Sequence, residues 1–79
     1  MFIGGGLDAA MFDAIWSRIA PGTRLVAHAV TLETEALLSD LHQRHGGELM
    51  RLEIAQAEPL GRYRAWKAAR SIVQWSALR

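Results

Sequence analysis

The sequence predicts a small mixed α/β domain, and three features of its hydropathy patterning carry this prediction. Residues 23–30, TRLVAHAV, form a short and nearly continuous apolar run, which is typical of a strand covered on both faces in a parallel sheet. Segments in which apolar residues recur at helical spacing precede and follow this run. Residues 48–58, ELMRLEIAQAE, then change to a period of two, which indicates a strand with one packed face.

The first predicted element is a short strand that leads into a helix. Residues 2–3 are β-formers, and the three glycines at 4–6 end the strand. From Asp8 to about Ala20 the spacing is helical, with Asp8 as the expected N-cap and a Pro-Gly pair as the stop. The apolar stripe of this helix comprises Met11, Phe12, Ile15, Trp16 and Ile19.

A second helix is predicted after the apolar run. Thr31 is its expected N-cap, and Glu33 and Glu35 fall in the first turn, where negative charge meets the positive end of the helix dipole. Gly46 offers the left-handed conformation that ends helices. The face expected to pack comprises Leu37, Leu38, Leu41 and His45.

Two further strands and an excursion complete the chain. In residues 48–58 we expect Met50, Leu52 and Ile54 to face the core together. Residues 59–70 have no clean period and are interpreted as an irregular or partly helical excursion, and residues 71–79 follow as a last strand. This strand presents Val73, Trp75 and Ala77 on one side. The first three strands should be adjacent or nearly so, and the last two should pair antiparallel.

Composition excludes several classes of function. The 79 residues suffice for one small domain, and a net charge of +1 argues against a nucleic-acid partner. The chain has no cysteine, which excludes disulfides and thiolate chemistry and favours a cytoplasmic location. Its apolar runs are far shorter than the roughly 20 residues that span a membrane. His28, His42 and His45 have no carboxylate at a persuasive spacing, so we predict no metal site.

One basic and aromatic cluster stands out between residues 62 and 70. Three interpretations stay open for it: a clamp for the carboxylates of an acidic ligand, a nucleic-acid patch with stacking rings, or a solvated excursion whose rings cover a sheet edge. The residues with the strongest claim to bind carboxylates are Arg62, Arg64 and Lys67. A small α/β module that uses this cluster for binding or self-association is therefore the alternative function.

Three stretches of the chain resemble a known enzyme family. The segments FIGGGLDAAMF, RLVAHAVTLE and the tail PLG…W…SIVQW are similar to the C-terminal half of the methyltransferase domain in the precorrin-6Y methyltransferase (decarboxylating) family. That family has a Rossmann-like sheet and depends on adenosylmethionine. The resemblance implies half of such a sheet, about four strands with a C-terminal antiparallel hairpin in which the last strand is inserted before the preceding one, and two main helices.

The resemblance also implies a site. In the family the glycine turn follows the fourth strand and borders the cleft for cofactor and substrate, so the expected rim comprises Gly4, Gly5, Gly6, Leu7, Thr31 and Glu33. From the sequence alone, the glycines are interpreted first as a tight strand-to-helix connection, and Glu33 as a charge at a helix start. Residues that would act as catalysts are not identified.

The family holds adenosylmethionine on a glycine-rich turn after its first strand, with an acidic residue after the second, and residues 1–79 contain neither. We therefore expect a single partial domain over residues 1–79, which binds no cofactor by itself and is inactive alone. The corrin precursor is expected as a partner only of the intact enzyme. An uncovered sheet edge at residues 2–3 should favour self-association.

Overall fold

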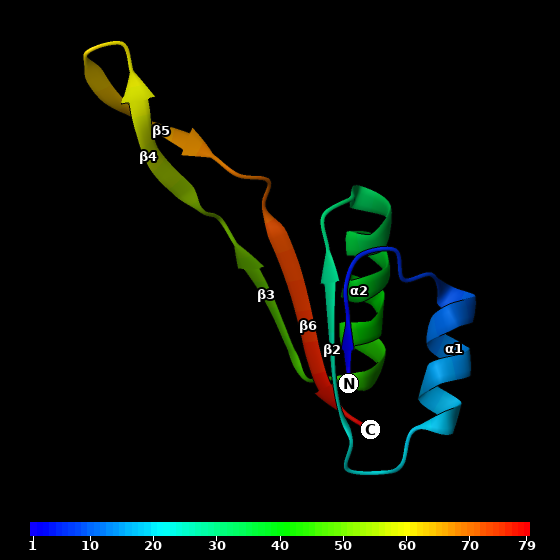
Figure 1. Ribbon diagram of the computed structural model, residues 1–79. Helices are drawn as coiled ribbons and strands as arrows, with labels where there is room; N and C mark the ends of the chain where they lie inside the picture. The colour runs from blue at the N-terminus through cyan, green and yellow to red at the C-terminus, as the bar shows by residue number, and fades with distance from the viewer.

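The computed structural model describes all of residues 1–79 as two helices, a four-stranded sheet and a projecting two-stranded ribbon (Figure 1). Both predicted helices are confirmed. In chain order the elements are β1 Phe2–Ile3, α1 Ala9–Arg18, β2 Arg24–Ala29, α2 Leu32–His45, β3 Glu48–Leu52, β4 Ala55–Leu60, β5 Tyr63–Ala68 and β6 Ile72–Leu78.

Both helices begin at the caps expected from the sequence. The Asp8 carboxylate accepts a hydrogen bond from the Met11 N–H at 2.8 Å, and the Thr31 hydroxyl accepts one from the Thr34 N–H at 3.3 Å. Gly46 ends α2 with a positive φ of 73°. Each cap satisfies backbone groups that a helix terminus leaves without a partner, which explains why these positions mark the boundaries.

The sheet has the order β1-β2-β6-β3. β1 pairs parallel with β2, and β6 pairs antiparallel with both β2 and β3. The last strand therefore lies between the second and third strands of the chain, as the resemblance implied. Residue patterning alone placed the first three strands adjacent or nearly so and did not locate the insertion, because local sequence carries no information on an insertion made by a distant strand.

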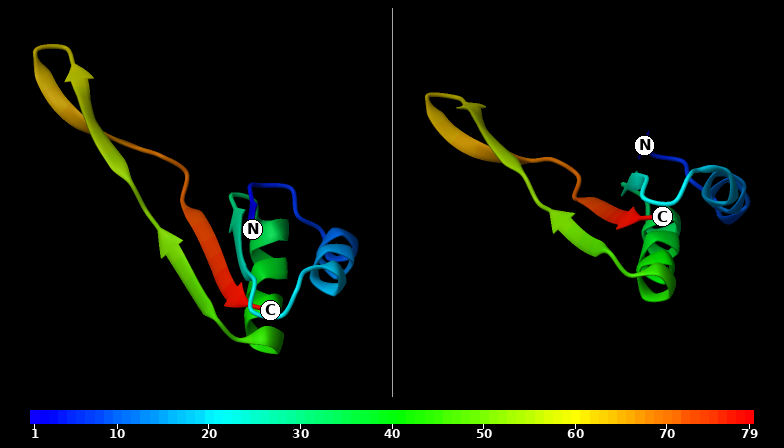
Figure 2. Two further views of the ribbon diagram at one scale, coloured as in Figure 1. Left: turned by 60° about the horizontal axis from the view of Figure 1, so that its bottom comes forward. Right: turned by 90° about the horizontal axis from the view of Figure 1, so that it is seen from below.

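The core lies between the sheet and the two helices. Both helices lie on the same side of the sheet, and no helix covers the other side (Figure 2). The predicted inward side of β6 is confirmed, since Val73, Trp75 and Ala77 are buried there. The remaining buried hydrophobic residues are Leu7, Phe12, Leu25, Ala27, Ala29, Leu38 and Leu41. In β2 the residues between the buried ones, Val26 and His28, are partly exposed. Residues 1–79 therefore do not cover both faces of this strand, although the sequence predicted such cover.

The predicted excursion at residues 59–70 is wrong. The structure forms a β-hairpin instead, with β4 and β5 paired from Ala55↔Ala68 to Leu60↔Tyr63 and Gly61 at the turn with a φ of 62°. The period of two was hidden because almost every residue on both faces is exposed, so hydropathy does not alternate. Pro59 also suggests a break, but an isolated ribbon tolerates proline where the ladder needs no donor.

The packed face predicted for residues 48–58 is also corrected. Met50 and Ile54 are 45% and 51% exposed, and the strand is interrupted after Leu52, where β3 gives way to β4. Met50 pairs with Gln74 on the side of the sheet that carries no helix. The period of two in β3 is present in the structure, but its apolar residues lie on the side of the sheet that no helix covers.

The hairpin projects away from the rest of the molecule (Figures 1 and 2). It gives the chain principal extents of 55 × 23 × 18 Å, and none of its residues belongs to the buried core. Its strands therefore depend on their own pairing and on one further backbone bond, from the Ala69 N–H to the Ile54 carbonyl at 2.9 Å.

Candidate functional site

The glycine turn lies at the carboxyl end of β1, between this strand and α1. Of its three glycines only Gly6 has a positive φ, at 85°. Gly4 and Gly5 have conformations open to other residues, and a Cβ built on either would meet no atom within 4 Å. The fold of these residues thus requires glycine at position 6 but not at positions 4 and 5.

The start of α2 lies beside this turn. β1 and β2 are parallel neighbours with Ile3 paired to Ala27, so both carboxyl ends reach the same edge of the sheet, at the top of Figure 1. In open α/β sheets this edge is where ligands bind. The structure therefore brings the glycine turn and the segment from Val30 to Glu33 to one edge of the sheet.

The rim residues differ in how much of each is free to meet a ligand. The Leu7 side chain is 3% exposed and belongs to the core, so only its backbone borders the rim. The Thr31 hydroxyl is engaged with Thr34, donating to its Oγ1 at 3.1 Å and accepting from its N–H. Glu33 is exposed in the first turn of α2 and forms no ion pair.

Sequence reasoning missed two apolar members of this edge. Val30 is 51% exposed and Leu32 is 81% exposed, on either side of the capping threonine. Val30 was counted as the end of a buried strand and Leu32 as the first residue of a helix. Val30 follows the last residue of β2, and Leu32 lies outside the apolar stripe of α2. These two positions are the signal that could have identified them as exposed.

The basic aromatic cluster of residues 62–70 lies on the hairpin, remote from the glycine turn (Figure 1). Pairing in β4 and β5 fixes its faces, because residues directly opposite share a face and neighbours alternate. Arg64 and Trp66 lie on one face, opposite Pro59 and Ala57, whereas Lys67 lies on the other face, opposite Gln56. The three cations proposed to bind carboxylates therefore do not converge on a single ligand.

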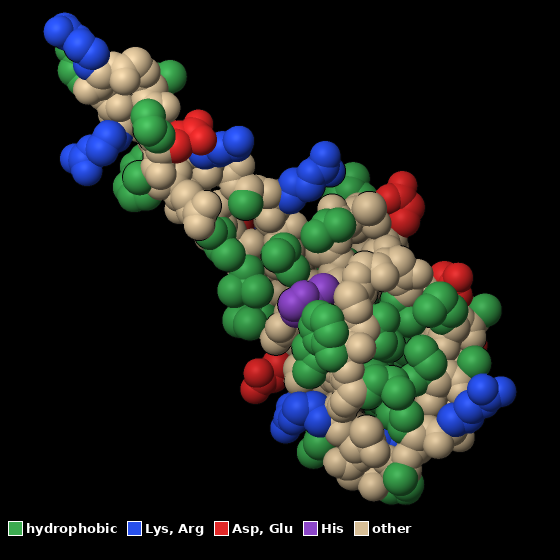
Figure 3. Space-filling model, in the orientation of Figure 1, with side chains coloured by type: hydrophobic (Ala, Val, Ile, Leu, Met, Phe, Trp, Pro, Cys, Tyr) green, Lys and Arg blue, Asp and Glu red, His purple; other side chains and the backbone are tan.

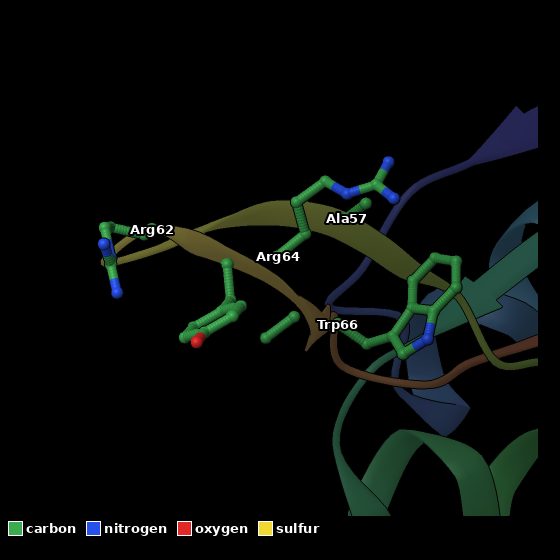
Figure 4. Close-up of a pocket in the computed structure, with 6 residues that line it drawn as sticks. Ala57, Arg62, Arg64 and Trp66 are labelled. Carbon is green, nitrogen blue, oxygen red and sulfur yellow. The ribbon is translucent and has the colours of Figure 1, made fainter.

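A shallow groove follows the hairpin near its tip. It is lined by Ala57, Arg62, Tyr63, Arg64, Ala65 and Trp66 (Figure 4). Tyr63 and Trp66 are 73% and 77% exposed, and the space-filling view shows hydrophobic side chains interspersed with Lys and Arg along the hairpin (Figure 3). Exposed aromatic rings therefore lie beside cations on this part of the hairpin.

The chain contains neither a grouped set of metal ligands nor a membrane-spanning helix. No three His, Asp or Glu side chains are grouped so that they could hold an ion. Neither helix has the length and apolar character that crossing a bilayer requires.

The fold and rim can now be compared with known proteins. The family described as the precorrin methyltransferase domain matches residues 1–79, which is the whole of the chain. The chain belongs to this family. Its sequence is 45% identical over 73 residues to a precorrin-6Y C(5,15)-methyltransferase (decarboxylating) from Sinorhizobium sp.. It is 39% identical over 77 residues to the protein of the same name from Mycobacterium tuberculosis.

A solved structure agrees in both fold and sequence. The C-terminal domain of precorrin-6Y C5,15-methyltransferase from Rhodobacter capsulatus superposes with a TM-score of 0.94 at 62% identity, over 99% of this chain and 42% of that one. The matches to the Sinorhizobium and Mycobacterium proteins include 92% and 96% of this chain. They include only 18% and 20% of the length of those proteins. The chain therefore spans less than half of the solved domain and about a fifth of the curated relatives.

Proposed function

We propose that this chain forms the C-terminal half of an adenosylmethionine-dependent methyltransferase domain that acts on a corrin precursor, with methylation and decarboxylation as the activity of the intact enzyme. Membership of the precorrin methyltransferase domain family supports this proposal. The relatives' names describe methyl transfer and decarboxylation for those proteins. In this reading the glycine turn and the start of α2 form one wall of the cleft.

The observation that carries the proposal is the presence of glycine where the fold does not require it. Neither Gly4 nor Gly5 has a positive φ, and neither faces an atom that a Cβ would meet. Glycine costs backbone entropy relative to alanine, so its use at two such positions calls for another reason. Close approach of a ligand to a bare backbone at the carboxyl edge of a sheet provides that reason.

These residues fit one side of a site for adenosylmethionine. The cofactor would supply an electrophilic methyl group. Gly4 and Gly5 leave backbone free of side chains at the sheet edge, and Val30 and Leu32 add exposed apolar surface beside it. Glu33 adds an unpaired carboxylate at the same edge. The glycines at 4–6 lack the G-x-G-x-x-G spacing of a turn that holds the cofactor, so we propose that the opposite wall comes from the preceding half of the domain.

Calorimetry with adenosylmethionine tests the proposal. We expect the 79-residue chain alone to show no micromolar binding and no methyl transfer. Mixed with, or fused to, the preceding half of a methyltransferase domain from the same family, it should bind the cofactor. Micromolar binding by the 79 residues alone would overturn the claim that they are inactive alone, and failure of the joined halves to bind would overturn the claim of a shared cleft.

Self-association is the second candidate function, and the hairpin favours it. Leu60, Tyr63 and Trp66 are 64%, 73% and 77% exposed, and the hairpin contributes nothing to the core. β4 and β5 pair only with each other, so each has a free edge, and the outer edge of β1 is also unpaired. Free strand edges with exposed apolar residues are templates for pairing with another chain. Sedimentation of the chain tests this candidate, and a monomer at all concentrations would contradict it.

Arg62 and Arg64 could also serve as ligands for carboxylates of the corrin precursor in the intact enzyme. Both line the groove beside Trp66, whereas Lys67 faces the opposite way and is not part of this arrangement. An arginine side chain pairs with a carboxylate through two parallel hydrogen bonds. Replacing both arginines by glutamine should then raise the KM for the precursor without changing binding of adenosylmethionine, and an unchanged KM for the precursor would contradict this role.

A further inference from the structure

Side chains, not backbone pairing, join α1 to the rest of the fold. The ribbon of α1 stands apart from α2 and from the sheet in all three views (Figures 1 and 2). Phe12 is the only fully buried residue of this helix, and Ile15 and Trp16 pack against the core beside it. A small number of side-chain contacts therefore decides where α1 lies.

Trp16 and Phe12 share these contacts. The ring centroid of Trp16 lies 5.2 Å from that of Phe12, 4.9 Å from that of His45 and 6.0 Å from that of Trp75. The ring centroid of Phe12 lies 5.5 Å from that of His45 and 5.8 Å from that of Trp75. His45 is the last residue of α2, and Trp75 lies in the inserted strand β6. Trp16 thus links α1 to the second helix and to the sheet at one point, at separations typical of favourable aromatic pairs.

Arg79 holds Trp16 in two ways. Its Nε donates a hydrogen bond to the Trp16 carbonyl oxygen at 2.7 Å, and its guanidinium carbon lies 5.2 Å from the centroid of the indole ring. The carbonyl belongs to the last turn of α1, where the helix itself supplies no donor and a positive charge is favourable. The cation over the ring adds an attraction of its own.

The same helix fixes the glycine turn at its other end. α1 starts at Ala9, directly after the Asp8 cap, the buried Leu7 and the three glycines. About 12 Å of helix separates Trp16 from Asp8, at 1.5 Å per residue. A helix behaves as a rigid rod over this length, so if Trp16 is no longer held, α1 and the turn attached to it become mobile together.

We propose that Arg79 and His45 are positioning residues, which fix the glycine turn by holding Trp16 in place. Neither residue lies in the rim itself. The proposal rests on the proposed function in one respect, since the turn must be a cleft wall for its position to affect binding. The mobility of the turn can be measured without any ligand, and the two claims are therefore separable.

Backbone order parameters from NMR relaxation of the chain provide the first test. In Arg79→Ala we expect the order parameters of Gly6 and Leu7 to fall from about 0.85 to below about 0.6, the range of flexible backbone, while those of β6 do not change. Arg79→Lys keeps a donor and a cation and should restore them. Arg70→Ala removes an equal charge from a residue outside this contact and serves as the control. Unchanged order parameters in Arg79→Ala would overturn the proposal.

His45→Ala provides a second variant, with the same direction expected at Gly6 and Leu7 because the imidazole contact with Trp16 is lost. In the domain completed by its preceding half, Arg79→Ala should raise the KM for adenosylmethionine about fivefold and leave kcat within about twofold, since a displaced wall weakens binding more than it alters the reacting atoms. A loss of order with no change in KM would support positioning and overturn the role of the turn in the cleft. An equal loss of kcat in Arg79→Lys and Arg79→Ala would overturn positioning by the cation.

Discussion

Trp75 donates its indole Nε1–H to the carbonyl oxygen of Gly46 at 2.9 Å. Trp75 is completely buried in β6, and Gly46 ends α2 with a positive φ. A single bond therefore ties the end of the second helix to the inserted strand. The sequence indicates each residue separately, one as core and one as helix end, and the contact between them is made only because β6 lies beside β3 and beneath α2.

Removing this bond should destabilise the fold measurably. Trp75→Phe keeps an aromatic ring but leaves the Gly46 carbonyl without its donor and opens space in the core. We expect the free energy of unfolding to fall by about 2 kcal/mol, from the sum of a lost buried hydrogen bond and a small cavity. Urea unfolding measures this change. Trp66→Phe is the matched control, because Trp66 is 77% exposed on the hairpin and should change the stability by less than about 0.5 kcal/mol.

Gly46 and Gly47 form a second matched pair. Both have a positive φ, at 73° and 84°, but a Cβ on Gly47 would overlap the Ser76 carbonyl oxygen and the Ala77 side chain, whereas a Cβ on Gly46 meets nothing. Gly46→Ala should therefore cost about 1 kcal/mol in conformational strain. Gly47→Ala adds a backbone clash and should cost about 3 kcal/mol or more. Equal losses in thermal unfolding would show that the clash is relieved by movement of β6.

Local sequence patterns predict those parts of the fold that depend on interactions between residues close in sequence. Asp8 and Thr31 are caps because a side-chain oxygen satisfies N–H groups at the first turn, and this signal needs no knowledge of the rest of the chain. The position of β6 between β2 and β3 depends on contacts across 20 or more residues, as in the pairing of Leu52 with Ile72 and the bond from Trp75 to Gly46. Only the resemblance to a family contained that information.

The hairpin shows a second limit of prediction from hydropathy patterns. Its residues alternate between faces in space, but both faces are exposed, so no hydropathy contrast records the alternation. Likewise, the resemblance assigns the glycine turn, Leu7 and Thr31 to one candidate rim, but the sequence cannot show that the Leu7 side chain is part of the core. Burial of a residue next to a glycine turn depends on where α1 packs, and side chains distant in sequence decide this.

The compact part of the fold should not depend on the hairpin. Replacing residues 55–68 by a short Gly-Asn-Gly link removes no buried core residue. We expect the midpoint of thermal unfolding to change by only a few degrees, because hairpin residues bury almost nothing. Sedimentation of the same variant tests the second candidate function, in which the hairpin carries self-association. A large loss of stability at high dilution, where the chain is monomeric, would contradict the independence of the two parts.

Glycine-to-alanine substitutions in the turn should separate stability from binding. Gly4→Ala and Gly5→Ala place a Cβ in open space with no positive φ, so unfolding should change by less than about 0.5 kcal/mol. Gly6→Ala forces alanine to a φ of 85° and should cost about 1 kcal/mol. If Gly4 and Gly5 are glycine because a ligand approaches their backbone, each alanine should weaken binding of adenosylmethionine or of the corrin precursor about tenfold or more in the completed domain, while Gly6→Ala acts mainly on stability. Calorimetry of both ligands measures this, and full affinity in the Gly4→Ala and Gly5→Ala variants would mean that the turn is only a strand-to-helix connection.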